Sequence, residues 1–177
     1  MNHRKITTIA AAALVAMGCV HLNRASDATA FRDPEVGMVL RVANLAEMRE
    51  GDLARDRAAS QAVKDFASAM ASEHAQASSK TENELARKEI PSADSDLSRQ
   101  IDTESGKTVE ALRARTGADF DRAYMDRTVA FHRYLIDTID KTLKPAAKNK
   151  VVVTALDETR ATAQKDLTKA EEIRKGL

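Results

Sequence analysis

Three ionisable residues stand inside apolar helical stripes of this sequence: Glu47, His74 and His132. A helix advances about 100° per residue, so each of the three shares a face with large apolar neighbours. A buried ionisable group is costly unless it is paired or bound. One carboxylate and two imidazoles are a suitable ligand set for a divalent transition metal such as Zn, Cu or Fe. These three residues therefore form the candidate metal site.

The three side chains are expected at one height in the fold. Antiparallel helices joined by a short loop run beside each other at equal rise per residue. Glu47 precedes a predicted turn near Ala59 by almost the same length of chain as His74 follows it. His132 precedes a second predicted turn, near Pro145, by a similar length of chain. The spacing predicts that the three residues converge.

The same spacing places other polar residues of the last helix. Thr159 is predicted at the level of the candidate site. Asp166 is predicted deeper, beside Asp121, in a second inward polar layer. Four basic residues are predicted to lie on a solvated face with acidic neighbours, namely Lys64, Arg122, Arg127 and Arg133.

A structural interpretation of the same residues stays open. Glu47 and His74 could form a buried, charge-assisted hydrogen bond, with His132 bonded to Thr128 or Tyr124, which would fix the register of the helices. Two methionines near the histidines, Met70 and Met125, could add thioether ligands for copper, although such residues more often fill gaps in a core.

The sequence argues against an enzyme. Di-iron carboxylate bundles carry a Glu-x-x-His pair on each of two helices, whereas Ala71 and Val129 occupy the corresponding positions before His74 and His132. The chain has no Gly-rich phosphate loop, no CxxC pair and no HExxH helix. A ferritin-like oxidase is therefore the least favoured function.

The elements that must position the site are helices. Stripes at helical spacing predict four main helices, separated by turns near Ala59 and Pro145 and by a polar connection over residues 92–116 that contains a lighter helix. Asp33 before Pro34 is typical of a capped helix start. The prediction is an all-α chain: an antiparallel four-helix bundle, ferritin-like, with a long crossover between the second and third main helices.

Composition agrees with one helical domain. Of 177 residues 32 are alanine, six are aromatic and none is Trp. The 28 basic and 27 acidic residues nearly cancel, so net charge does not suggest a nucleic-acid partner.

The N-terminus predicts export. Arg4 and Lys5 precede an uncharged stretch over residues 6–20, as in a secretory signal. One interpretation cleaves after the small-residue sequence 28–30, giving a signal peptide over 1–30 and a single helical domain over 31–177. The alternative is a lipoprotein signal that ends before Cys19, whose lipid would anchor the protein in the outer membrane. Both place it in the periplasm or outer membrane of a bacterium.

Two blocks of the sequence carry a family resemblance. The stretch AVKDFASAMASEH over 62–74 and the stretch GADFDRAYMDRTVAFH over 117–132 resemble DUF4142, a bacterial family of exported domains of unknown function often labelled predicted outer membrane protein. The resemblance implies a ferritin-like helical fold, export to the envelope and no established reaction. It matches Glu73-His74 to an Asp-His pair and His132 to a histidine of the third helix. Relatives often carry a later histidine near the position of Asp166, and its absence here would alter a metal site.

The function predicted from these observations is an exported envelope helical-bundle protein with a structural, stress-protective or interaction role and no established reaction. The alternative is a periplasmic metal-binding bundle that uses Glu47, His74 and His132. A protein partner is not identified by any motif.

Overall fold

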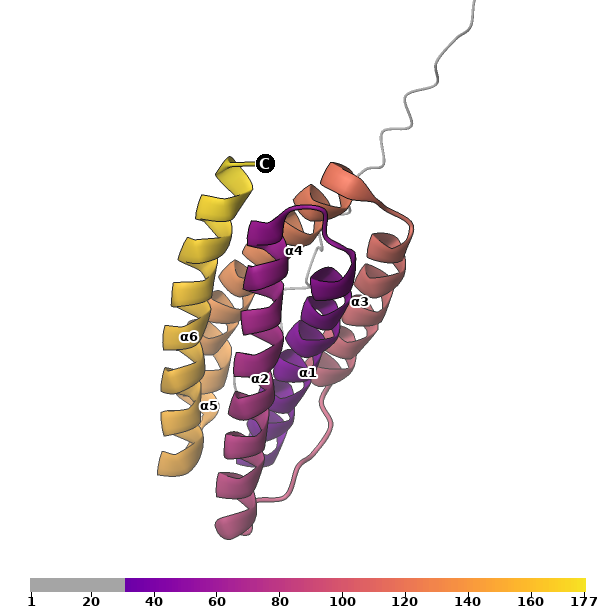
Figure 1. Cartoon of the computed structure of the whole chain (residues 1–177). Helices are drawn as coiled ribbons and strands as arrows, with labels where there is room; N and C mark the ends of the chain where they lie inside the picture. The colour runs from indigo at the N-terminus through magenta and orange to yellow at the C-terminus, as the bar shows by residue number, and fades with distance from the viewer. Residues whose placement is uncertain (1–30) are drawn as a thin grey trace, which may run out of the picture.

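A computed structural model describes residues 31–177, and this part of the chain is all-helical, without a strand (Figure 1). The predicted signal segment and Cys19 lie outside the described residues. None of the described helices is both long and apolar enough to cross a membrane. The elements in chain order are α1 (Asp33–Arg57), α2 (Gln61–Arg87), α3 (Asp96–Arg113), α4 (Gly117–Thr138), a π-helical turn η2 (Ile139–Leu143), α5 (Lys144–Ala146) and α6 (Lys150–Lys175).

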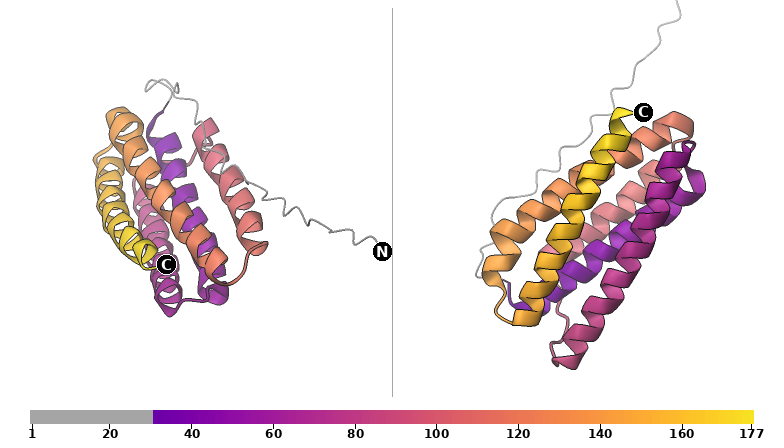
Figure 2. Two further views of the ribbon diagram at one scale, coloured as in Figure 1. Left: turned by 90° about the horizontal axis from the view of Figure 1, so that it is seen from above. Right: turned by 60° about the vertical axis from the view of Figure 1, so that its left-hand side comes forward.

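Within residues 31–177, five long helices lie side by side (Figures 1 and 2). Helix α1 packs against α2 and α3, α4 packs against α6, and α2 also contacts α6. The lighter helix predicted in the connection over 92–116 is α3, an 18-residue helix that packs on α1. The prediction of an all-helical structure is confirmed for residues 31–177, and the connection is itself part of the packed structure.

The start of α1 is tied to the start of α6. Asp33 was predicted to cap α1, but Arg32 is the cap residue, and its backbone N–H donates to the Glu35 carboxylate at 3.1 Å. The Asp33 carboxylate instead accepts hydrogen bonds from the backbone N–H groups of Lys148 (2.8 Å) and Asn149 (3.0 Å). One carboxylate therefore accepts hydrogen bonds from two backbone N–H groups of the turn that leads into α6.

At the opposite end of the molecule, another carboxylate accepts hydrogen bonds from the backbone of a turn. Asp121 of α4 accepts hydrogen bonds from the backbone N–H groups of Ala59 (2.9 Å) and Ser60 (2.7 Å) in the turn between α1 and α2. The prediction of a second inward polar layer at Asp121 is therefore wrong in its partners, because the buried carboxylate serves a turn and not the fourth helix.

Two apolar clusters fill the interior. The first apolar cluster lies toward the turn between α5 and α6, and the second lies toward the turn between α1 and α2. Large members of the first are Leu40, Leu135, Ile139, Leu143 and Leu156. Large members of the second are Phe66, Met70, Phe120, Tyr124 and Met125.

A buried polar layer separates the two clusters. Each of four helices has a buried polar residue close, along the chain, to the place where members of one cluster give way to members of the other. These residues, which we call the polar layer, are Glu47 on α1, His74 on α2, His132 on α4 and Asp166 on α6.

The close approach of α1 to α2 depends on Gly51. A Cβ atom at this position would lie 3.0 Å from the Ala67 carbonyl oxygen and 3.3 Å from the Ala71 Cβ. Backbone oxygen cannot rotate away as a flexible side chain can, so a larger residue must push the helices apart. The contact is about one helical turn from the polar layer on both helices, because Glu47 precedes Gly51 on α1 and His74 follows Ala71 on α2.

We expect Gly51→Ala to lower the free energy of unfolding by about 1 to 3 kcal/mol, because the added methyl group overpacks the contact between α1 and α2. The matched control is Gly106→Ala in α3, where a Cβ meets nothing within 4 Å. The control should raise stability by about 0.5 to 1 kcal/mol through helix propensity alone. Chemical denaturation of both variants tests this, and equal gains at the two positions would contradict it.

Candidate functional site

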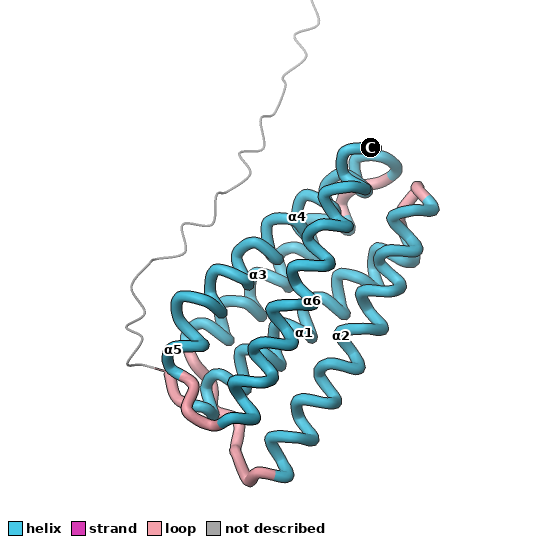
Figure 3. The backbone as a smooth tube through the Cα atoms, turned by 90° about the vertical axis from the view of Figure 1, so that its left-hand side faces the viewer, coloured by secondary structure: helices cyan, strands magenta, loops and turns pink. Residues whose placement is uncertain are grey.

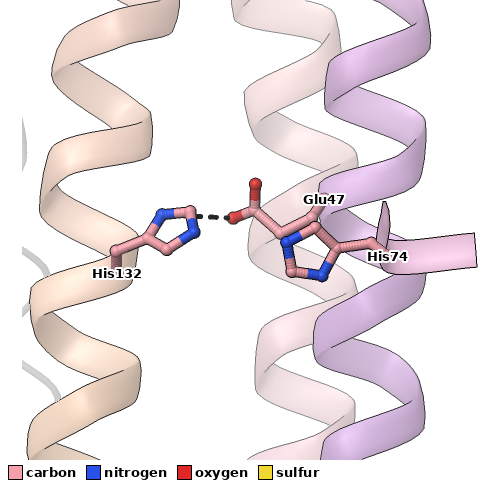
Figure 4. Close-up of side chains that lie close together, drawn as sticks. All are labelled: Glu47, His74 and His132. Atoms are coloured by element: carbon pink, nitrogen blue, oxygen red, sulfur yellow. Dashed lines mark ion pairs between the residues drawn. The ribbon is translucent and has the colours of Figure 1, made fainter. Parts of the chain in front are cut away.

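Glu47, His74 and His132 come together in the core although they belong to three helices (Figure 4). One ligand atom from each residue lies within 4.8 Å of the others. Their exposed fractions are 2%, 3% and 0%. The structure therefore places all three predicted residues at one height, with their side chains directed inward.

Hydrogen bonds determine which imidazole nitrogens are free. The Nδ1 atom of His74 donates to the Oδ1 atom of Asn44 at 2.8 Å, and the Nδ1 atom of His132 donates to the backbone oxygen of Thr128 at 2.8 Å. In a neutral imidazole the other nitrogen, Nε2, then carries the lone pair. Neither Nε2 atom has a hydrogen-bond partner among residues 31–177.

These hydrogen bonds test the prediction that Glu47 bonds to His74 and that His132 bonds to Thr128 or Tyr124. The predicted hydrogen bond between Glu47 and His74 is wrong, because Asn44, one turn earlier on α1, is the partner of His74. The bond from His132 to Thr128 is confirmed. Glu47 lies 4.0 Å from the Nδ1 atom of His132, which is beyond hydrogen-bond distance (dashed in Figure 4).

Asp166 completes the polar layer from α6. Its Oδ2 atom lies 3.9 Å from Nε2 of His74 and 4.0 Å from Nε2 of His132, and it has no hydrogen-bond partner in the described part of the chain. One buried carboxylate oxygen thus lies near two buried imidazole nitrogens, and the three atoms come from three helices.

The prediction that Asp166 lies deeper than the site is wrong, because the turn was placed at Pro145. Helix α5 continues to Ala146 and α6 begins at Lys150, so the turn occupies residues 147–149. Measured from these helix ends, His132 precedes the turn by nearly the same length of chain as Asp166 follows it. The two residues are therefore level. Thr159 lines a cavity that His74 also lines.

Burial shifts the protonation of all four residues toward their neutral forms. It lowers the pKa of His74 to about 3, with His132 and Lys165 adding to the effect. It also lowers the pKa of His132 to about 4, against the hydrogen bond to Thr128. Burial raises the pKa of Asp166 to about 6, although Lys165 opposes this. It raises the pKa of Glu47 well above its usual range, with the nearby Glu50 carboxylate adding to the rise.

A second buried acid on α1 was not predicted. Glu50 is 1% exposed and lies one turn after Glu47. Its two carboxylate oxygens accept hydrogen bonds from Nε and one terminal nitrogen of Arg127, each at 3.1 Å. The Glu-x-x-Glu spacing places both acids on one helix face and was the available signal.

Arg127 was predicted to lie on a solvated face, which is wrong. Its side chain is 21% exposed, and its guanidinium lies 4.5 Å from the centre of the Phe131 ring. The Phe131 ring and the buried Glu50 carboxylate hold Arg127 inward. Its aliphatic chain can cover the core while its guanidinium group pairs with Glu50.

Tyr124 adds an unpartnered hydroxyl near the layer. Its OH group is buried without a hydrogen-bond partner among the described residues, and its pKa is raised by burial and by the Glu47 carboxylate. The two methionines of the copper hypothesis, Met70 and Met125, are members of the second apolar cluster.

The donor set fits a divalent transition metal. Zinc binds imidazole nitrogen and carboxylate oxygen at about 2.0 to 2.2 Å, so ligand atoms around a tetrahedral ion lie roughly 3.4 Å apart. The distances of 3.9 and 4.0 Å from Asp166 to the two histidines require a closure of only a fraction of an ångström on each side. Asn44 and the Thr128 carbonyl already hold the imidazoles in the orientation that metal-ligating histidines adopt.

Comparison with known proteins gives one match. The family described as "Domain of unknown function (DUF4142)" matches residues 21–173. No curated protein and no solved structure matches the chain.

The lowered pKa of His74 predicts a pH dependence for the metal-free protein. An unfolded imidazole takes up a proton near pH 6.5, whereas His74 does so only near pH 3. The stability that this group contributes is therefore present above pH 6.5 and is lost as the pH falls. Relative to His74→Gln, wild type should lose about 1.4 kcal/mol of unfolding free energy per pH unit between pH 6 and 4.

Asp166→Asn gives the control of opposite sign. Because the pKa of Asp166 is raised to about 6, its stabilising contribution is present at low pH and is lost as the pH rises from 4 to 6. Denaturant titrations at several pH values measure both differences. Parallel curves for wild type and the two variants would refute the shifted pKa values of His74 and Asp166.

Arg127→Met should lower the free energy of unfolding by about 2 to 4 kcal/mol, because it leaves the buried Glu50 carboxylate without its partner. The double variant Glu50→Gln, Arg127→Met should recover much of this loss, since it removes the uncompensated charge. A double-mutant cycle by chemical denaturation measures the coupling. Additive losses would show that the pair does not interact in the folded protein.

Proposed function

Since the chain belongs to the DUF4142 family, for which the match names no activity, we propose a function from the polar layer itself: an exported helical protein that binds a divalent transition metal in its core. The proposal includes no catalytic turnover. The protein's role in the bacterial envelope is then to hold a metal ion, and protection against metal stress follows from that binding.

One observation carries the proposal. The Oδ2 atom of Asp166 lies 3.9 Å from Nε2 of His74 and 4.0 Å from Nε2 of His132, and all three atoms are buried without a hydrogen-bond partner among residues 31–177. Buried polar atoms nearly always have a partner, so three unpartnered acceptors at one point indicate a shared ligand that is an electron-pair acceptor.

The fourth ligand is Glu47. Its carboxylate lies in one group with the two histidines, within 4.8 Å. With the sequence alone, one carboxylate and two histidines left a four-coordinate site incomplete. Asp166 supplies the missing ligand. A set of two imidazoles and two carboxylates favours zinc or ferrous iron over copper(I), which prefers sulfur.

The arrangement of the ligands also supports the finer fold proposal. Helices α1, α2, α4 and α6 each supply one residue of the polar layer, as in bundles that build metal sites from facing helices. We infer an antiparallel four-helix bundle of ferritin-like type made by these helices, with α3 as an addition to α1 in the crossover between α2 and α4.

Export and membrane attachment remain proposals that rest on the N-terminal sequence. The uncharged stretch over residues 6–20 supports secretion, and Cys19 is the residue that would receive a lipid anchor. The nearly balanced charge supports the absence of a nucleic-acid partner.

We expect purified protein to bind about one Zn²⁺ or Co²⁺ per chain, because the ligand set holds one ion. A hundredfold excess of ion over its dissociation constant should raise the free energy of unfolding by about 2.7 kcal/mol. Binding should weaken below about pH 6, where protons compete for the site. Thermal shift and isothermal titration calorimetry at neutral pH measure these effects.

The double variant His74→Gln, His132→Gln and the single variant Asp166→Asn should lose the metal-induced shift while keeping helical circular dichroism. The matched control is Asp102→Asn, an exposed acid paired with Arg49, which should bind the ion like wild type. If neither Zn²⁺, Co²⁺, Fe²⁺ nor Mn²⁺ shifts the wild-type melting temperature, the polar layer serves only the register of the helices.

A further inference from the structure

A cavity of about 100 Å³ lies between α2 and α6 and reaches the polar layer. Both helices are on the side of the molecule that faces the viewer in Figure 3. The lining of the cavity includes exposed residues at one end, Lys80 and Glu158, and buried residues at the other, His74 and Asn44. It therefore connects the molecular surface with a residue of the polar layer.

Three threonines contribute hydroxyl oxygens to the wall of the cavity, whose lining is otherwise mostly apolar. They are Thr81 of α2 and Thr159 and Thr162 of α6, which line the same cavity as His74. Hydroxyl oxygens can replace part of the hydration shell of a hard or borderline divalent cation during passage. A purely apolar wall would instead oppose the entry of an ion.

An ion pair stands at the outer end. Both carboxylate oxygens of Glu158 accept hydrogen bonds at 2.6 Å from Nζ of Lys80, and each side chain is 51% exposed. The pair joins α2 to α6 across the cavity. Because exposed pairs contribute little to stability, it can open at small cost.

Resting on the proposed metal function, we propose that this cavity is the entrance by which a divalent cation passes from solvent to the buried site, with the Lys80–Glu158 pair at its mouth controlling the rate of entry. The Glu158 carboxylate attracts the cation when Lys80 moves away from it. The ammonium group repels the cation while the pair is closed.

The first test fills the passage. Thr159→Leu places a larger, apolar side chain on the cavity wall, and its matched control is Thr154→Leu on the same helix, which lines a separate surface groove beside Lys150. Stopped-flow mixing with Co²⁺, followed by visible absorbance, measures the rate of loading. Thr159→Leu should slow loading about tenfold and leave the equilibrium affinity unchanged, because a barrier slows entry and exit alike.

The second test changes the charge at the mouth and needs no change in the core. Lys80→Met should speed loading about threefold and Glu158→Gln should slow it about threefold at low ionic strength, and both effects should shrink at high salt. Lys144→Met is the control for net charge, since Lys144 forms a similar exposed pair with Asp157 on α6. That control should load like wild type.

The outcomes separate the two proposals. If Co²⁺ does not bind wild type at equilibrium, the proposed metal function is wrong and the entrance fails with it. If Co²⁺ binds but Thr159→Leu loads as fast as Thr154→Leu, and the two mouth variants load as fast as Lys144→Met, the metal function stands and the entrance is wrong. Circular dichroism verifies that each variant folds. If Thr159→Leu does not fold, the loading rates of Lys80→Met and Glu158→Gln decide whether the entrance is correct.

Discussion

The burial of four ionisable residues between two apolar clusters is the constraint on which the rest of the structure depends. Taking such groups out of water is costly, so each must become neutral, find a partner or bind an ion. The histidines lose their charge and donate through Nδ1, one to Asn44 and one to the Thr128 carbonyl. Glu47 and Asp166 have raised pKa values for the same reason. The four residues come from four helices. A shift of one helix along its axis would therefore move its polar residue into one of the apolar clusters.

The ends of the molecule hold the layer at one height. Asp33 fastens the turn before α6, and Asp121 fastens the turn between α1 and α2, each with two hydrogen bonds to backbone N–H groups. At the level of the layer, Gly51 allows α1 and α2 to approach closely enough that Asn44 and His74 meet. Glu50 and Arg127 join α1 to α4 in the same region. The height and the lateral spacing of the site are thus set by different residues.

Helical periodicity was sufficient to predict the inward orientation of Glu47, His74 and His132, because the angular step of about 100° per residue is independent of the neighbouring helix. It was insufficient for Asp166, whose height depends on where one turn begins. The π-helical turn at Ile139–Leu143 and the continuation of the helix through Pro145 moved that turn further along the chain. Periodicity also failed for Arg127, since a long cationic side chain on a boundary position can point either way until its partner, Glu50, is known. The family resemblance is confirmed, whereas Cys19 lies outside the described residues.

A hydrogen-bond network alone does not account for the centre of the polar layer. Once each Nδ1 donates outward, Nε2 of His74, Nε2 of His132 and Oδ2 of Asp166 are all acceptors, and acceptors cannot bond to one another. One proton on Asp166 could satisfy a single imidazole, and with a pKa of about 6 this carboxyl group is mostly ionised at neutral pH. In the proposed function, a divalent cation would accept an electron pair from each of the three atoms and offset the negative charge of the acids. The outward hydrogen bonds of the two imidazoles leave both Nε2 atoms as acceptors, which is the arrangement that the proposed metal function needs.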